Sequence, residues 1–284
     1  TSGQTGVMGN ITVNGDLVAG SGGTNEFVLG GNAPQTISGS GNISLGSLTI
    51  GNKAAVNLQK NIAVDQTVRV YGSLNFNNNQ VSGNAIFVAN GMETPVAGTG
   101  NTTAGSYMLT GNTGIASSTR GWTISGTGLA PNTTILAFST TSDTIYLSHA
   151  MTATGPAAAV TVTADGATLE TANTNGFDPA SGSVTALGTQ TFEDNINYII
   201  DGVTNWPFGI STGGSGTPIT ASFVEVNAPV TVNRSVTVSN HVLVNGKLTL
   251  RPLDMLHILP GAAITGTFSN ANYIATDYNA TTGD

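Results

Sequence analysis

Residues 230–250 read VTVNRSVTVSNHVLVNGKLTL, and this stretch decides the fold class. Apolar-x-apolar triplets recur in it about every six residues, at 230–232, 236–238, 242–244 and 248–250. Alternation with a period of two indicates β-strands that bury one face. A short strand and a corner repeated in this way are typical of one face of a β-helix, so the stretch predicts a β-solenoid.

The same texture runs through residues 1–90, where short alternating runs are separated by Gly, Asn or Ser. These runs are shorter than typical sandwich strands, and phrases such as NGDLVAG, YGSLNFN and VNGKLTL recur along the chain. Gly and Asn suit the sharp corners between stacked coils. We therefore expect an all-β fold, a right-handed parallel β-helix whose first part spans 1–90 and whose second part spans 222–284.

The middle of the chain, residues 91–221, differs in composition and contains both tryptophans, Trp122 and Trp206. Within it, residues 121–163 read as strand, Gly/Pro turn, strand, hairpin and strand. Residues 189–211 combine aromatic and acidic side chains, which indicates an edge hairpin or an end of the insert. We expect 91–221 to form a small β domain inserted into the solenoid, together with this hairpin.

Composition excludes several classes of protein. Charged residues make up 8% of the chain, and 15 acidic against 7 basic residues give a net charge of −8. The basic residues are scattered, whereas a nucleic-acid partner requires clustered cations. The chain has no cysteine, and no apolar run approaches the roughly 20 residues of a transmembrane helix. The sequence begins and ends within its repeat pattern, so we expect a segment of a longer secreted protein.

Three phrases carry a resemblance to a known class of proteins. Residues 30–76, which contain QTISGSGNISLGSLTIG, and residues 241–277, which begin HVLVNGKLTL, resemble the large repetitive cell-surface proteins of Bacteroidota that use type IX secretion. Residues 124–162 are similar to a small β module of surface proteins and phage structural proteins. The resemblance implies an adhesive or structural protein at the bacterial cell surface, built as an elongated filament or stalk. It implies no catalytic residues.

The residues offer little for catalysis or metal binding. Glu193 and Asp194 are adjacent, and neighbours on a strand point to opposite faces, so they do not form a facing catalytic pair. Asp194 with Asn195 and Asn197 is the best local candidate for Ca²⁺, but the spacing matches no calcium loop. His149, His241 and His257 have no second ligand at metal spacing, so we expect them at the surface rather than in a metal site. We expect no catalytic site, no cofactor and no metal.

Aromatic side chains are the candidates for binding a partner or a glycan. Trp206, Phe208 and Tyr198 lie in one segment, and Trp122 lies in the expected insert. Exposed aromatic rings stack on sugars or anchor partner proteins, although such residues belong more often to a core.

We expect a structural or adhesive extracellular protein, not an enzyme. Its expected partners are other copies of itself, further repeats of the same polypeptide, and surface glycans. Two alternatives stay open at this point. The first is a β-helix protein that binds or cleaves polysaccharide, since many enzymes of that class are β-helices. The second is a segment of a phage tail fibre, which the middle module suggests.

Overall fold

The protein is all-β, as the sequence predicts. The computed structural model describes the following residues: 4–19, 25–139, 141–202, 204, 219–232, 234–251, 254–270 and 273–276. The one helical element in these ranges is a single 3-10 turn, η1 (Ser117–Thr119). No helix in the described part is long and apolar enough to cross a membrane.

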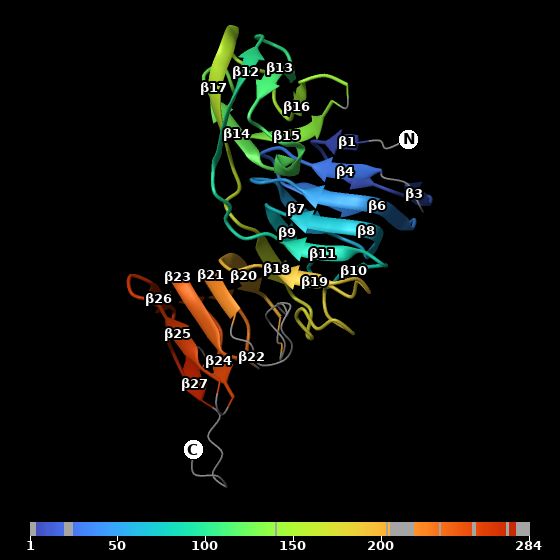
Figure 1. The fold of residues 1–284 in the computed structure, drawn as a ribbon. Coiled ribbons are helices and arrows are strands. Elements are labelled where there is room, and N and C mark those ends of the chain that lie inside the picture. Colours follow the sequence, from blue (N-terminus) through green and yellow to red (C-terminus); the bar gives the residue numbers. More distant parts are fainter. Residues whose placement is uncertain are drawn as a thin grey trace.

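Most strands belong to three parallel sheets, which together we call the parallel stack (Figure 1). The first sheet has eight strands: β1 (Gln4–Val7), β3 (Leu17–Ala19), β4 (Glu26–Leu29), β6 (Ile43–Ile50), β8 (Ile62–Val70), β10 (Val81–Ser82), β11 (Ile86–Ala89) and β19 (Gln190–Phe192). The second sheet has ten: β2 (Ile11–Thr12), β5 (Gln35–Ser38), β7 (Ala55–Leu58), β9 (Ser73–Asn75), β18 (Thr168–Thr171), β20 (Ile196–Ile200), β21 (Ile219–Val226), β23 (Val236–Val244), β25 (Leu256–Ile258) and β26 (Ala263–Gly266). The third has β22 (Val230–Val232), β24 (Leu248–Leu250) and β27 (Ile274–Thr276).

Successive strands alternate between the sheets rather than pairing with each other. From β4 to β9 the chain visits the first and second sheets in turn, and each strand pairs in parallel with the strand two positions later. In register, Ser47 lies beside Thr67, and Gln35 lies beside Val56. One pass through both sheets therefore takes about 20 residues.

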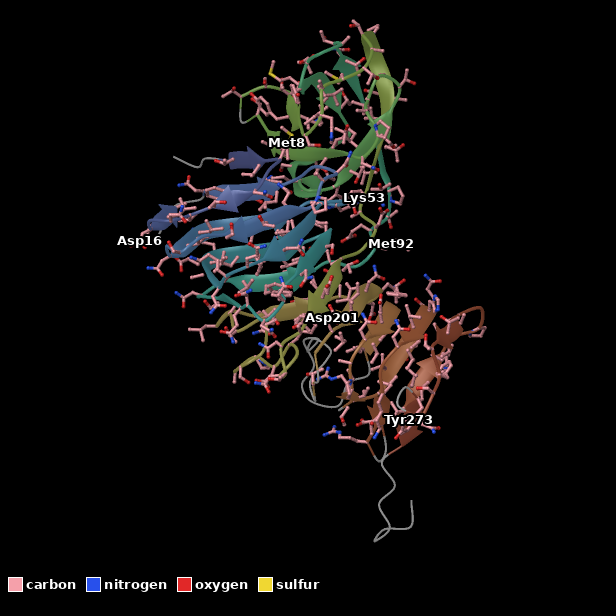
Figure 2. The ribbon with its side chains drawn as sticks, turned by 180° about the vertical axis from the view of Figure 1, so that it is seen from behind. Met8, Asp16, Lys53, Met92, Asp201 and Tyr273 are labelled. Atoms are coloured by element: carbon pink, nitrogen blue, oxygen red, sulfur yellow. The ribbon has the colours of Figure 1, made fainter. Side chains whose placement is uncertain are left out.

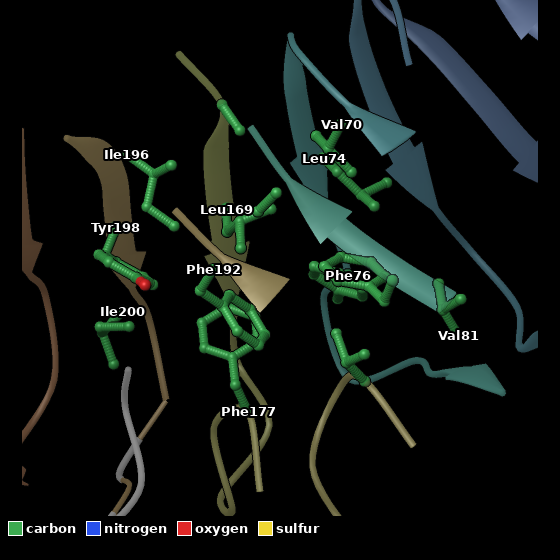
Figure 3. Packing of buried hydrophobic residues seen from close by; sticks show 14 of the residues in the cluster. Val70, Leu74, Phe76, Val81, Leu169, Phe177, Phe192, Ile196, Tyr198 and Ile200 are labelled. Atoms are coloured by element: carbon green, nitrogen blue, oxygen red, sulfur yellow. The ribbon is translucent and has the colours of Figure 1, made fainter. Parts of the chain in front are cut away.

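A single hydrophobic cluster fills the space between the sheets and runs from Leu29 to Leu250 along the chain. The alternating positions supply it: in β23, Val236, Val238 and Val242 are buried, while the residues between them are partly exposed. One part of the core is an aromatic group, which Figure 3 shows in close-up. Its members are Phe76, Phe87, Phe177, Phe192 and Tyr198, with ring centroids of neighbouring members 5.6–6.4 Å apart.

A closed antiparallel barrel interrupts the stack after β11. Its strands are β12 (Val96–Thr102), β13 (Met108–Thr113), β14 (Thr123–Gly126), β15 (Thr133–Phe138), β16 (Ile145–Leu147) and β17 (Gly155–Thr163). The barrel has its own hydrophobic core, to which Ile124, Ile135 and Val162 contribute. The chain leaves the stack at Ala89 and rejoins it at Thr168, where β18 pairs with β9.

The predicted insert, 91–221, is longer than the barrel, which spans 96–163. Strands β18, β19 and β20 lie in the predicted range but pair in parallel with the stack. The segment 189–211 supplies β19 to the first sheet and β20 to the second, so its described part is no edge hairpin. Ile196, Tyr198 and Ile200 alternate along β20, and their side chains all face the core. The acidic and aromatic residues of the segment led to the hairpin prediction because this alternation was not recognised.

Candidate functional site

The barrel packs against the outer face and one edge of the first sheet (Figure 1), and strand β15 makes the closest approach. Two glycines of the stack open the space that Leu136 of β15 occupies. A Cβ atom on Gly6 would lie 2.7 Å from Leu136 Cδ1, and one on Gly30 would lie 2.8 Å from Leu136 Cδ2. Tyr71, which follows β8, enters the barrel core and meets the Trp122 ring edge to face at 6.2 Å. The barrel is therefore docked on the stack by packing.

A groove runs along the seam between the barrel and the first sheet. Its larger part is a cleft of about 940 Å³, and a second part of about 370 Å³ adjoins it. The two parts share Glu26, Ser47 and Arg120 in their linings, so they adjoin along the seam. Met8, which follows β1, lies at the mouth near the barrel (Figure 2). We call the two parts together the seam groove; the volume of each part is in the range typical of ligand sites.

An ion pair lies at the junction of the two parts. Arg120 Nη1 contacts Glu26 Oε2, and Glu26 Oε1 accepts a hydrogen bond of 2.7 Å from Thr49 Oγ1. With its amide turned toward the guanidinium, Gln4 also accepts from Arg120 Nη1 at 2.8 Å. Burial lowers the pKa of Arg120 from its usual value, but a guanidinium keeps its charge at neutral pH. The pair thus ties the barrel to β1, β4 and β6 as well as lining the groove.

Replacing Arg120 by methionine is expected to lower the free energy of unfolding by about 2 kcal/mol, because Glu26 would be left without a cation. The Glu26 side chain is only 14% exposed, so water cannot fully solvate its carboxylate once the guanidinium is removed. Urea denaturation measures the loss. The double variant Arg120→Met/Glu26→Gln should recover part of it, since both charges are then removed. A single variant as stable as the wild type would contradict this role of the pair.

The second cation of the groove is Arg69, on the exposed face of β8. Its register partner in β6 is Thr49, and its side chain lines the smaller part of the groove. In the described part of the chain no carboxylate lies within ion-pair distance of Arg69. Two of the seven basic residues of the protein, Arg69 and Arg120, therefore lie in this one groove.

The aromatic residues that the sequence suggested for binding lie elsewhere. Tyr198 is 1% exposed and packs against Phe177 in the core of the stack, so its predicted contact with a glycan or partner is corrected to a core position. The cause is its phase on β20, where it shares the inward face with Ile196 and Ile200. Trp122 is likewise buried, in the barrel core. Trp206 and Phe208 lie outside the described residues.

The aromatic side chains that line the larger part of the groove are Tyr107, Phe138 and Tyr146 of the barrel. Tyr107 is 50% exposed and Tyr146 is 41% exposed. Tyr146 faces outward because its neighbours Ile145 and Leu147 on β16 are buried in the barrel. The alternation in that strand could have indicated an exposed tyrosine, but its position beside Arg120 depends on how the barrel docks.

The carboxylate candidates do not converge on a metal or catalytic site. Glu193 Oε2 accepts a hydrogen bond of 2.8 Å from the backbone N–H of Gly91, where the chain leaves for the barrel. Asn195 accepts from Ser239 Oγ at 3.2 Å, and the Asn197 amide donates to Thr168 Oγ1 at 3.1 Å, so they bind separate neighbours. Among the described residues, no three His, Cys, Asp or Glu side chains could hold one metal ion.

The histidines lie apart from one another. His149 contacts Ser148 at the barrel, with 2.9 Å between His149 Nδ1 and Ser148 Oγ. His241 meets the Phe223 ring edge to face at 5.7 Å and bonds Thr265 Oγ1 at 2.6 Å across neighbouring strands. His257 is exposed beside Thr237. These positions are on or near the surface.

A row of carboxyl and amide side chains crosses the outer face of the second sheet. Glu170 accepts from the Asn75 amide, and the Asn227 amide donates to Asp201 Oδ1 at 2.8 Å and to Glu225 Oε1 at 3.0 Å. Partial burial, a hydrogen bond with Asp201 and the charges of Asp201 and Glu225 raise the pKa of Glu170 to about 7 from its ordinary 4.5. A proton is thus held on this row near neutral pH.

The raised pKa of Glu170 predicts a pH dependence of stability. Between pH 4.5 and 7 the folded state retains a proton that the unfolded chain has released, so stability falls as pH rises through this window. Glu170 is only partly buried, and solvent screening limits the effect to about 1 kcal/mol. The variant Glu170→Gln should be more stable than wild type by that amount at pH 8 and equal to it at pH 4, by urea denaturation. Equal differences at both pH values would count against the shift.

Comparison with known proteins adds no assignment to this geometry. No protein family, curated protein sequence or solved structure matches the chain. The seam groove is therefore characterised by its own residues. Sequence reasoning missed it, although the scarcity of basic residues is a signal that could have drawn attention to Arg69 and Arg120.

Proposed function

We propose that the protein is a right-handed parallel β-solenoid with an inserted barrel, and that it serves as a structural or adhesive protein outside a bacterial cell. The single hydrophobic core from Leu29 to Leu250 carries this proposal, because strands of all three parallel sheets contribute to it. The passage of successive strands between sheets supports coiling. Parallel crossover connections are right-handed in about 98% of cases, which supports the hand.

A role that depends on shape follows from the direction of the backbone hydrogen bonds. In a stack of parallel coils these bonds run along the long axis, so each coil holds the next and the whole resists bending. Such a rod suits a stalk that presents a domain away from a surface. The barrel is the domain that the rod would present, and the seam groove is the recessed surface between the barrel and the rod.

Self-association along the axis is part of the proposal. Inward-facing residues of the first described coil, Ile11 and Leu17, are only half-buried, and so are Leu256 and Ile274 in the last coils. Further coils would cover these side chains and pair with the strand edges that the barrel leaves open. The partners we propose are therefore other copies of the chain or further repeats of the same polypeptide.

Retention under flow tests the adhesive role. Beads that carry the protein through a C-terminal biotin tag would be passed over surfaces coated with neutral glycans, acidic glycans, matrix proteins or bacterial cells. We expect retention on at least one surface, several-fold above beads that carry heat-denatured protein. Retention equal to that control on every surface would overturn the adhesive role.

A second candidate, a protein that binds or cleaves polysaccharide, is favoured by the seam groove, which combines exposed tyrosines with hydrogen-bonding groups. A reducing-end assay separates cleavage from binding. Incubation of the protein with a panel of polysaccharides should leave the number of reducing ends unchanged. Their release in proportion to protein concentration would replace the structural proposal with an enzymatic one.

A further inference from the structure

We propose that the seam groove binds an acidic polysaccharide, with the carboxylate of a uronic acid unit on Arg69 and neighbouring sugar rings on the tyrosines of the barrel. This inference rests on the proposed adhesive function and names the class of ligand. The groove exists only where the barrel meets the first sheet, so the site is built jointly by both parts of the fold.

Charge is the first argument for an acidic ligand. The smaller part of the groove holds two guanidinium groups, Arg69 and Arg120, and one carboxylate, Glu26. Glu26 is already paired with Arg120, which leaves the groove with a local charge of about +1 in a protein of net charge −8. A guanidinium binds a carboxylate through two parallel hydrogen bonds and does so best where water is partly excluded.

Hydrogen-bonding groups around Arg69 suit sugar hydroxyls. Ser47 and Thr67 lie side by side in register on the sheet, and Ser117 faces them from η1 at the barrel side. Hydroxyl side chains both donate and accept, so they match the hydroxyl groups of a sugar without requiring a fixed pattern. Two cations are too few for a nucleic acid, whose binding depends on several phosphate contacts.

Tyr107 and Tyr146 are the third argument. Both line the larger part of the groove and expose about half of their surface or slightly less. Exposed apolar surface that is gathered in one cleft marks a binding surface, and tyrosine offers a flat face for a sugar ring together with a polar hydroxyl. The groove therefore has an anionic subsite beside Arg69 and a stacking surface in the larger cleft, as an extended chain of sugars requires.

Calorimetric titration with oligogalacturonate tests the inference. The matched ligands are the methyl-esterified oligomer, which has the same rings without the charge, and dextran sulfate, which has charge without a carboxylate. We expect binding of oligogalacturonate that weakens at least 10-fold on methyl esterification and at least 10-fold in Arg69→Gln. Tyr146→Ala should weaken binding about 5- to 10-fold, because a stacking contact is lost.

Arg251→Gln is the matched control, since it removes the same charge from an exposed arginine that lies outside the groove and pairs with Asp254. It should change affinity less than 2-fold. Urea denaturation of each variant shows whether the fold is kept. Equal losses in Arg69→Gln and Arg251→Gln, equal binding of the methyl ester, or equal binding of dextran sulfate would overturn the inference. Absence of binding to oligogalacturonate by a protein that holds beads on other surfaces would overturn this inference and leave the adhesive role in place.

Discussion

Replacing Phe177 by alanine is expected to lower the free energy of unfolding by about 3–5 kcal/mol. Phe177 lies in the turn after β18, is fully buried, and inserts its ring among Phe76, Phe192 and Tyr198 at centroid distances of 5.7–5.9 Å (Figure 3). These four rings come from three separate passes of the chain, so the cavity left by alanine would border several coils at once. Urea denaturation monitored by circular dichroism measures the loss.

Phe268→Ala is the control for this prediction, because the Phe268 side chain is 54% exposed. It should change the free energy of unfolding by less than about 0.5 kcal/mol. If both variants were equally stable, Phe177 would have to be at the surface, and the shared core would be contradicted at its aromatic group.

Replacing Gly72 by alanine is expected to cost about 3 kcal/mol, at the upper end for inserting a methyl group into a packed site. Gly72 forms the corner between β8 and β9, and a Cβ atom there would lie 2.2 Å from the carbonyl oxygen of Gly51 and 2.4 Å from that of Ala54. Both oxygens belong to the backbone of the preceding coil, so relief requires two coils to separate. The midpoint of urea denaturation should fall accordingly.

Gly9→Ala makes the same chemical change where no atom lies within 4 Å of the added carbon. Its stability should match wild type to within about 0.5 kcal/mol. Tolerance of alanine at Gly72 as complete as at Gly9 would mean that the corners are not in contact, and the close stacking of coils would be contradicted.

The strands could be predicted because apolar and polar residues alternate along them in the sequence. The triplets at 230–232 and 248–250 are β22 and β24, whereas those at 236–238 and 242–244 belong to one strand, β23, so the corner predicted between them is wrong. Alternation with period two survives in any β-sheet with one buried face, so local pattern was sufficient. The limits of the insert were harder to predict. Strands β18 and β20 belong to the stack, and in the sequence only their inward-facing residues, such as Ile196 and Tyr198, indicate this.

The seam groove could not be predicted in the same way. Arg69 and Tyr146 line adjoining parts of the groove because the barrel docks on the sheet, and this docking depends on Leu136 fitting against Gly6 and Gly30. No periodic pattern records such a contact between distant segments. The adhesive role, the cell-surface location and the likeness to Bacteroidota surface proteins remain predictions, and the experiments above test the role.

One distance tests most directly the claim that the two ends of the chain share a single parallel stack with the barrel looped out. Thr36 and Leu243 lie on the outer face of the second sheet, in one row whose members pair in register: Thr36, Asn57, Asn75, Glu170, Ile199, Glu225 and Leu243. The row spans six steps between strands, or roughly 29 Å at about 4.8 Å a step. The chain contains no cysteine, so spin labels on Thr36→Cys/Leu243→Cys report this pair alone in pulsed electron paramagnetic resonance. We expect one narrow distribution between about 25 and 35 Å; a broad distribution, or one centred beyond about 45 Å, would contradict the stack.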